Sequence, residues 1–164
     1  RNSKDRYNEL IELLRLKQHG STLAITVGSV TLLYFNHAKD YYRKNGRPTS
    51  EVGRIRAALK FLNQMHADTL IEDFGPRALK SIQQLMVETP VVRKNKAGEV
   101  VSSRTRARSA INKNVRRIVA MFKWATEQEL CSGERYQKLR AVPEAEGGIG
   151  TYARAYIGSR AGTS

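Results

Sequence analysis

The sequence predicts an all-α protein: a four-helix bundle with an N-terminal arm helix and a short C-terminal helix. Apolar residues recur at helical spacing in several segments, and no segment shows the alternation of a half-buried strand. The clearest stripe lies within residues 102–129, where five apolar residues share one face of a 3.6-residue period. These are Ile111, Val115, Ile118, Phe122 and Ala125. We expect this helix to organise the bundle, with Ser102, Ser103 or Thr105 as its cap.

The remaining elements are bounded by local signals. An amphipathic arm helix is predicted over 5–17, and it can pack either on its own domain or on a neighbouring molecule. Thr26 caps a second helix that Asn45-Gly46 ends, Thr49 and Ser50 cap a third, Gly75-Pro76 begins a fourth, and a short helix spans 133–140. The predicted buried stripes are Val27, Val30, Tyr34, Ala38 and Tyr41, then Val52, Ile55, Leu59 and Leu62, then Leu79, Ile82 and Met86.

Three regions follow from these boundaries. Residues 1–21 form the arm, 22–143 the helical domain, and the glycine-rich 144–164 a flexible tail or the start of a linker. Residues 90–101 are predicted to be a basic, mobile loop. Cys131 is the only cysteine, which excludes an internal disulfide and fits a reducing compartment. With no membrane-length apolar run and no signal-peptide pattern, we expect a cytoplasmic protein that does not contact membranes.

Charge is strongly positive and is grouped in bands. The chain has 29 Lys and Arg against 15 Asp and Glu, a net charge of +14. Residues 39–60 contain seven basic and two acidic side chains, and 93–117 contain nine and one, whereas 68–88 contain two and four. Such banding favours an oriented binding face, and double-stranded DNA is the leading partner.

Candidate DNA contacts come from both basic bands. A helix start offers unpaired N–H groups and a positive dipole end to a phosphate, and both bands lead into a helix start. We expect the aromatic residues around Tyr34 to be core or core rim rather than platforms for bases. The candidate residues are Arg43, Lys44, Arg47, Thr49, Ser50, Arg54, Lys94, Lys96, Arg104, Thr105, Arg106, Arg108, Asn112, Lys113, Arg116 and Arg117.

Signatures of catalysis are missing. His19, His37 and His66 are scattered, no cysteine or histidine has zinc-ligand spacing, and no phosphate-binding glycine motif occurs. The acids Asp68, Glu72 and Asp73 are better explained as surface or capping residues than as a magnesium site. We therefore expect no catalytic residue, no metal and no small-molecule cofactor.

Four segments together resemble the amino-terminal half of tyrosine recombinases, the phage-type site-specific integrases. They are TVGSVTLLYFNHA, YYRKNGRPTSEVGRIRAALKFL, DFGPRALKSIQQLM and TRARSAINKNVRRIVAMFKWATEQEL. The resemblance covers roughly residues 7–143 and implies a SAM-like core-binding domain that grips duplex DNA for recombination and DNA integration. It implies that the third helix and the 102–129 helix approach the major groove. Contacts would then be Thr49, Ser50 and Arg54 on one side, and Arg104, Thr105, Arg108, Asn112, Lys113, Arg116 and Arg117 on the other, with Asn112 and one or two arginines reaching base edges.

The chain departs from that family where catalysis is concerned. No histidine is followed by arginine at the third place, and 21 residues follow Pro143, so Tyr152 and Tyr156 are not expected to be a nucleophile. We expect this chain to be no enzyme by itself, its tail being a linker or, as we favour, an unrelated end. Two alternatives stay open: a basic RNA-binding module, or a protein-interaction module docking through its arm. Self-association on DNA through the arm is also possible.

Overall fold

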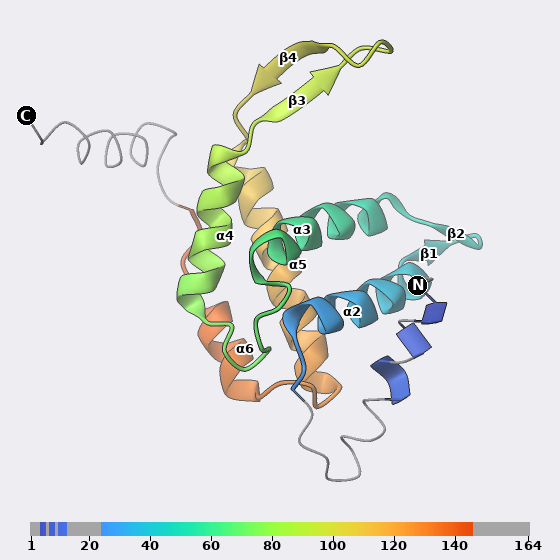
Figure 1. Cartoon of the computed structure of the whole chain (residues 1–164), viewed down its shortest axis with the longest axis vertical. Helices are drawn as coiled ribbons and strands as arrows, with labels where there is room; N and C mark the ends of the chain where they lie inside the picture. Colours follow the sequence, from blue (N-terminus) through green and yellow to red (C-terminus); the bar gives the residue numbers. More distant parts are fainter. Residues whose placement is uncertain (1–3, 6, 9, 13–23, 146–164) are drawn as a thin grey trace, which may run out of the picture.

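The computed structural model describes residues 4, 5, 7, 8, 10–12 and 24–145. Its main elements are five helices and two small antiparallel hairpins, shown in Figure 1. The helices are α2 (Val27–Tyr41), α3 (Ser50–His66), α4 (Pro76–Glu88), α5 (Arg108–Glu127) and α6 (Gly133–Arg140). The strands are β1 (Arg43–Lys44), β2 (Arg47–Pro48), β3 (Val91–Lys94) and β4 (Val100–Arg104). The fold is therefore dominated by helices, in agreement with the predicted class, but the two small hairpins mean that it is not purely α.

The helices pack around α5, which contacts α2, α3, α4 and α6. The rings of Phe74 and Phe122 stack with centroids 4.9 Å apart at the centre of this packing. Every residue of the predicted stripes in α3, α4 and α5 is buried, and α6 has the predicted bounds. Thr26 caps α2 as predicted, because its hydroxyl accepts a hydrogen bond from the Ser29 amide at 3.2 Å. One member of the α2 stripe was wrong: Tyr41 is 69% exposed, since the helix ends there.

The hairpin β1–β2 joins α2 to α3. Asn45 and Gly46 were predicted to end a helix, but they form the turn of this hairpin, with φ of 53° and 74°. Two successive positive φ angles are what a tight two-residue hairpin turn requires, and Asn-Gly suits them best. Lys44 pairs with Arg47 across the turn. The Asn-Gly pair correctly predicted that the chain reverses here, but the reversal is a hairpin turn and not a helix end.

The hairpin β3–β4 replaces the predicted loop and the predicted start of the long helix. Asn95 builds the turn: its side-chain oxygen accepts hydrogen bonds from the amides of Ala97 and Glu99, and Gly98 has φ of 85°. The helix α5 begins at Arg108, after an Ala107 N-cap that has no side-chain hydrogen bond. None of the three predicted caps is used. Strand alternation was absent from the sequence because both faces of this hairpin are exposed, so neither needs to be apolar.

Both ends of the chain extend the helical body. The described residues of the predicted arm are helical, and Tyr7, Leu10 and Ile11 pack against the core of the same chain. Residues 13–17 of that helix, and the 146–164 part of the predicted tail, lie outside the described residues. Glu144 and Ala145 are held against α5. Within the described ranges, no helix is long and apolar enough to cross a bilayer.

Candidate nucleic-acid interface

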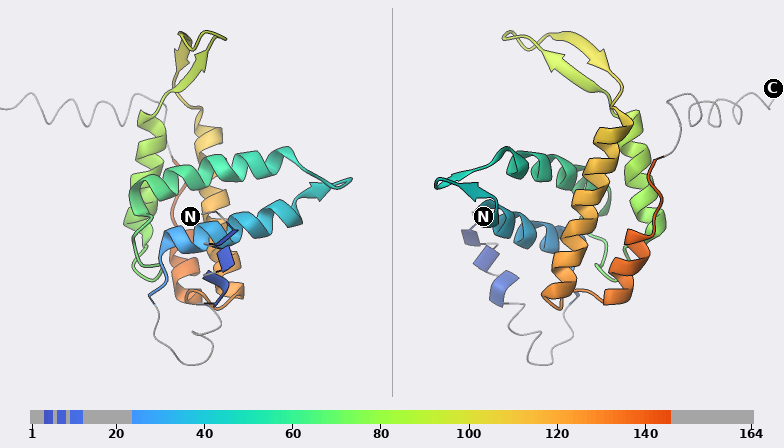
Figure 2. Two further views of the ribbon diagram at one scale, coloured as in Figure 1. Left: turned by 45° about the vertical axis from the view of Figure 1, so that its right-hand side comes forward. Right: turned by 180° about the vertical axis from the view of Figure 1, so that it is seen from behind.

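Each hairpin leads directly into the start of a helix. We call β1–β2 with the first turn of α3 the first hairpin–helix unit, and β3–β4 with the first two turns of α5 the second. Figures 1 and 2 show both hairpins projecting beyond the helical body, with α3 between them in Figure 1. Every residue from 43 to 48 and from 92 to 104 is exposed. The fold thus brings the two basic bands of the sequence to two protruding edges.

The second unit carries cations that nothing in the described part of the chain neutralises. Five predicted contacts there are exposed and form no ion pair with another described residue: Lys94, Lys96, Arg104, Arg108 and Lys113. Thr105 is exposed beside them. The first turn of α5 contains no acidic residue and has no side-chain cap. An uncapped helix start among free cations is a favourable place for an anion.

In the first hairpin–helix unit, one of the predicted contacts already has partners within the chain. Lys44 and Arg47 are exposed and unpaired among the described residues, whereas Arg43 donates to the Lys39 carbonyl at 3.2 Å and lies 3.7 Å from Asp40. Thr49 is the N-cap of α3 without a side-chain bond, and Ser50 begins the helix. Unlike α5, this helix has an acidic residue, Glu51, in its first turn.

Glu51 binds two of the arginines predicted to contact DNA. Arg117 donates from Nε to Oε1 at 2.6 Å and from a terminal nitrogen to Oε2 at 3.1 Å, and Arg54 lies 3.5 Å away. The hydrogen bonds from Arg117 are the main reason that the pKa of Glu51 is lowered. The Arg117 side chain is only 16% exposed. Arg117 joins α5 to the start of α3, because a guanidinium matches a carboxylate in two places, and its contact with DNA stays a prediction.

Glu144 occupies two more of the predicted contacts. Its carboxylate accepts hydrogen bonds from the Asn112 amide at 3.1 Å and from Arg116. The Asn112 carbonyl accepts a third bond from the Ala145 amide at 3.0 Å, and Asn112 is buried. Asn112 was predicted to read a base edge; in this structure both ends of its amide are engaged by Glu144 and Ala145, and its contact with DNA stays a prediction. Arg116 is 68% exposed but paired.

Arg106, another predicted contact, packs against an aromatic ring in this structure. Its guanidinium lies 5.2 Å from the ring centroid of Phe61 on α3, and the residue is half-buried. This contact places a cation over an aromatic face, which stabilises the junction between the β3–β4 hairpin and the helices. Arg106 therefore packs inward instead of facing solvent with its neighbours.

Sequence reasoning missed three residues that shape this surface. Arg93 lies exposed on β3 opposite Ser102 and was left out of the candidate set. Glu51 and Glu144 were not recognised as partners of the basic residues. The pairs Glu51–Arg117 and Glu144–Arg116 are separated by 66 and 28 residues, so no local pattern could have revealed them. Arg93 had a usable signal, since two valines before it and Asn95 with Gly98 after it are typical of a hairpin.

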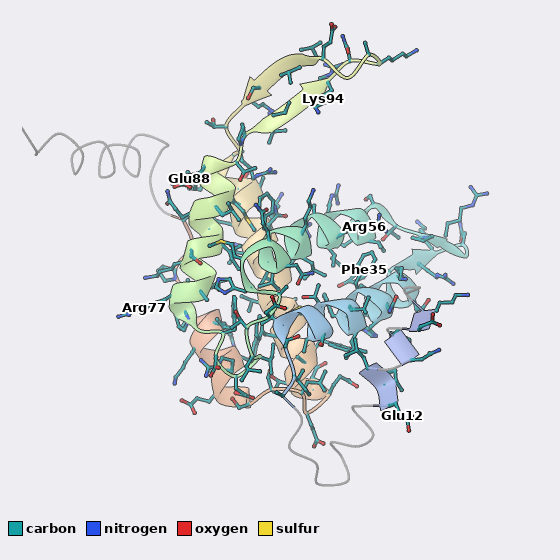
Figure 3. The ribbon with its side chains drawn as sticks, in the orientation of Figure 1. Glu12, Phe35, Arg56, Arg77, Glu88 and Lys94 are labelled. Carbon is teal, nitrogen blue, oxygen red and sulfur yellow. The ribbon has the colours of Figure 1, made fainter. Side chains whose placement is uncertain are left out.

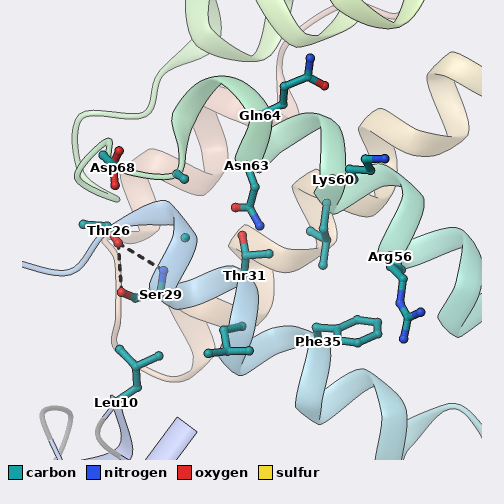
Figure 4. A pocket seen from close by; sticks show the side chains of 14 residues that line it. Leu10, Thr26, Ser29, Thr31, Phe35, Arg56, Lys60, Asn63, Gln64 and Asp68 are labelled. Carbon is teal, nitrogen blue, oxygen red and sulfur yellow. Dashed lines mark hydrogen bonds between the residues drawn. The ribbon is translucent and has the colours of Figure 1, made fainter. Parts of the chain in front are cut away.

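A large groove lies elsewhere, between α2 and α3. It has a volume of about 990 Å³, and Figure 4 shows Phe35, Arg56 and Lys60 along it. The Arg56 guanidinium lies 5.0 Å from the Phe35 ring centroid. The residues that line this groove include one acid, Asp68, and neither histidine nor cysteine. Among the described residues no group of three His, Cys, Asp or Glu side chains is placed to hold a metal ion.

The chain matches no known family model, no curated protein and no solved structure.

Proposed function

We propose that this chain binds duplex DNA as the core-binding domain of a tyrosine recombinase, gripping DNA through its two hairpin–helix units. The observation that carries the proposal is the set of exposed cations on both hairpins and at the acid-free start of α5 that form no ion pair with any described residue. The net charge of +14 supports it, because excess positive charge gathered at protruding edges attracts a polyanion. The recombinase assignment rests on the sequence resemblance.

The mechanism is electrostatic positioning followed by readout of bases. Lys44 and Arg47 from one unit, with Lys94, Lys96 and Arg108 from the other, would neutralise phosphates and release the counterions bound to them. Arg104 has the fork geometry that pairs with guanine in the major groove. Arg117 and Asn112 are assigned to holding the fold. In this proposal the strand-cleaving chemistry belongs to a separate catalytic domain.

The arm has a defined place in this proposal. Tyr7, Leu10 and Ile11 already pack against the core of their own chain. Self-association on DNA through these residues would require the arm to leave that position. We therefore assign the DNA contacts to the hairpin–helix units and none to the arm.

A salt titration with matched charge variants tests the proposal. Affinity for mixed-sequence duplex DNA should fall steeply between about 50 and 200 mM salt, with a log–log slope of several units. K44Q/R47Q should weaken binding and reduce the slope by roughly two. R77Q/K80Q removes the same charge from α4, where Arg77 points away from α5 (Figure 3), and should change little.

Two results would contradict DNA binding at this surface. One is a flat salt dependence, or no binding at the lowest salt. The other is an equal loss from K44Q/R47Q and R77Q/K80Q, which would mean that only total charge matters. Preference for duplex RNA over duplex DNA in direct competition would favour the RNA-binding alternative instead.

A further inference from the structure

The β3–β4 hairpin, residues 91–104, has the form of a free two-stranded ribbon. All its residues from 92 to 104 are exposed, including Val92 at 43%, Val100 at 60% and Val101 at 55%. An isolated two-stranded hairpin is marginally stable in water, and three exposed valines add an unfavourable apolar surface. The ribbon is therefore better suited to being covered by a partner than to serving as a simple connection.

The charges of the ribbon identify the chemistry of that partner. It carries Arg93, Lys94, Lys96 and Arg104 against the single acid Glu99. Glu99 accepts a hydrogen bond from the Asn95 side chain at 2.7 Å and so belongs to the turn. In the register of the strands, Val91 is opposite Arg104 and Arg93 is opposite Ser102. Opposed residues share a face, so both arginines lie on one side of the ribbon and Val92 with Lys94 on the other.

We propose that the β3–β4 ribbon enters the major groove of duplex DNA, with Lys94 and Lys96 at the phosphates along the groove walls. This inference rests on the proposed function and specifies which element reads the duplex. A two-stranded ribbon is about 5 Å between strand axes and about twice that with side chains, which fits a groove about 12 Å wide and not one about 6 Å wide. The five residues of β4 span about 17 Å along the strand, whereas the major groove is about 8.5 Å deep. The ribbon is therefore long enough to reach the floor of the groove.

The ribbon's two faces then meet different parts of the groove. Arg93 and Arg104 on one face can reach guanine edges, and Lys94 on the other face can meet a phosphate. Arg108 follows at the start of α5, where the uncapped helix end faces a phosphate. The ribbon and the helix start thus act as one continuous contact along the groove.

A duplex with a blocked major groove tests the inference. In one duplex each cytosine is replaced by glucosylated 5-hydroxymethylcytosine, which fills the major groove and leaves the phosphates unchanged; the control duplex is unmodified. The intact chain should bind the blocked duplex about 10-fold or more weakly, as expected when at least one base-edge contact is lost. A variant with residues 93–102 replaced by Asn-Gly should bind both duplexes equally and more weakly than the intact chain binds the control.

A second variant guards against misfolding of the shortened chain. R93Q/R104Q keeps the ribbon and should lose most of the discrimination between the duplexes, whereas R77Q/K80Q should keep it. Equal binding of both duplexes by the intact chain would overturn the ribbon inference and leave DNA binding standing. If both ribbon variants discriminated between the two duplexes as strongly as the intact chain does, the ribbon inference would also be overturned. The groove contact would then be assigned to α5. Failure of the intact chain to bind either duplex would refute the proposed function itself.

Discussion

The two hairpin–helix units have the same order of elements and opposite electrostatics at the helix start. In the first unit, Glu51 lies in the first turn of α3 and binds Arg117 and Arg54. In the second unit, the first turn of α5 contains no acid, and Arg108 and Lys113 have no ionic partner in the described part of the chain. One positive helix end therefore has an acidic residue in its first turn, and the other is left for an external anion.

This difference separates basic residues that hold the fold from those available to a ligand. Arg117 and Lys113 are four residues apart on α5, yet Arg117 is mostly buried against Glu51 whereas Lys113 is exposed. A count of positive charge treats them alike. We therefore expect the second unit to be the stronger DNA contact and the paired residues to serve the fold.

Removing three cations from each unit should produce the largest contrast. R104Q/R108Q/K113Q is expected to weaken duplex DNA binding by about 100-fold at roughly 100 mM salt, because three phosphate or base contacts are lost. R43Q/K44Q/R47Q should cost about 10-fold, since Arg43 is already engaged by Asp40 and the Lys39 carbonyl. Fluorescence anisotropy with one labelled duplex would measure both. Equal losses would remove the distinction between the units.

Arg117→Ala should destabilise the fold without a comparable effect on DNA. It leaves the partly buried Glu51 without its main partner, and we expect the free energy of unfolding to fall by about 2 kcal/mol. Lys113→Ala on the same helix should change stability by less than about 0.5 kcal/mol but weaken DNA binding. Urea denaturation and anisotropy on both variants provide the comparison. An R117A chain with normal stability and lost DNA affinity would restore Arg117 as a contact.

Glu144→Ala should strengthen DNA binding. Glu144 holds Arg116 and Asn112, so its removal frees a cation and an amide beside the start of α5. We expect affinity to rise by about 5-fold at low salt, with a steeper salt slope. Glu134→Ala removes the same charge from an exposed pair with Lys138 on α6 and should have less than half that effect. Identical gains in the two variants would show a general charge effect with no specific role for Glu144.

The smallest expected effect is a dependence of stability on pH through His66. Burial lowers the pKa of His66 below its ordinary 6.5, and its ring bonds Thr69 and Ser81 at the junction of α3 and α4. The unfolded chain therefore takes up this proton first, so the stability contributed by neutral His66 is complete above pH 6.5 and is lost as the pH falls below it. Urea midpoints at pH 7.5 and 5.5 should differ less in H66Q than in the parent.

The helices were predictable because their signals are local. Within each of the stripes that contain Ile55, Ile82 and Ile118, apolar residues recur at 3.6-residue spacing. Burial of these apolar faces forms the core. The hairpins were missed for the opposite reason. Their strands are short and exposed on both faces, so no alternation was imposed on them, and Asn45-Gly46 is compatible with both a helix end and a hairpin turn.

The candidate site likewise has one part that could be predicted from the sequence and another that could not. The sequence by itself determined where basic residues concentrate, which faces of the helices are apolar, and the resemblance on which the recombinase assignment depends. Only the tertiary structure decided which basic residues are free. Glu51 reaches Arg117 across 66 residues of chain, and Glu144 reaches Asn112 across 32, because folding brings distant segments into contact. Charge is a property of each residue, whereas its availability to a ligand is a property of what packs against it.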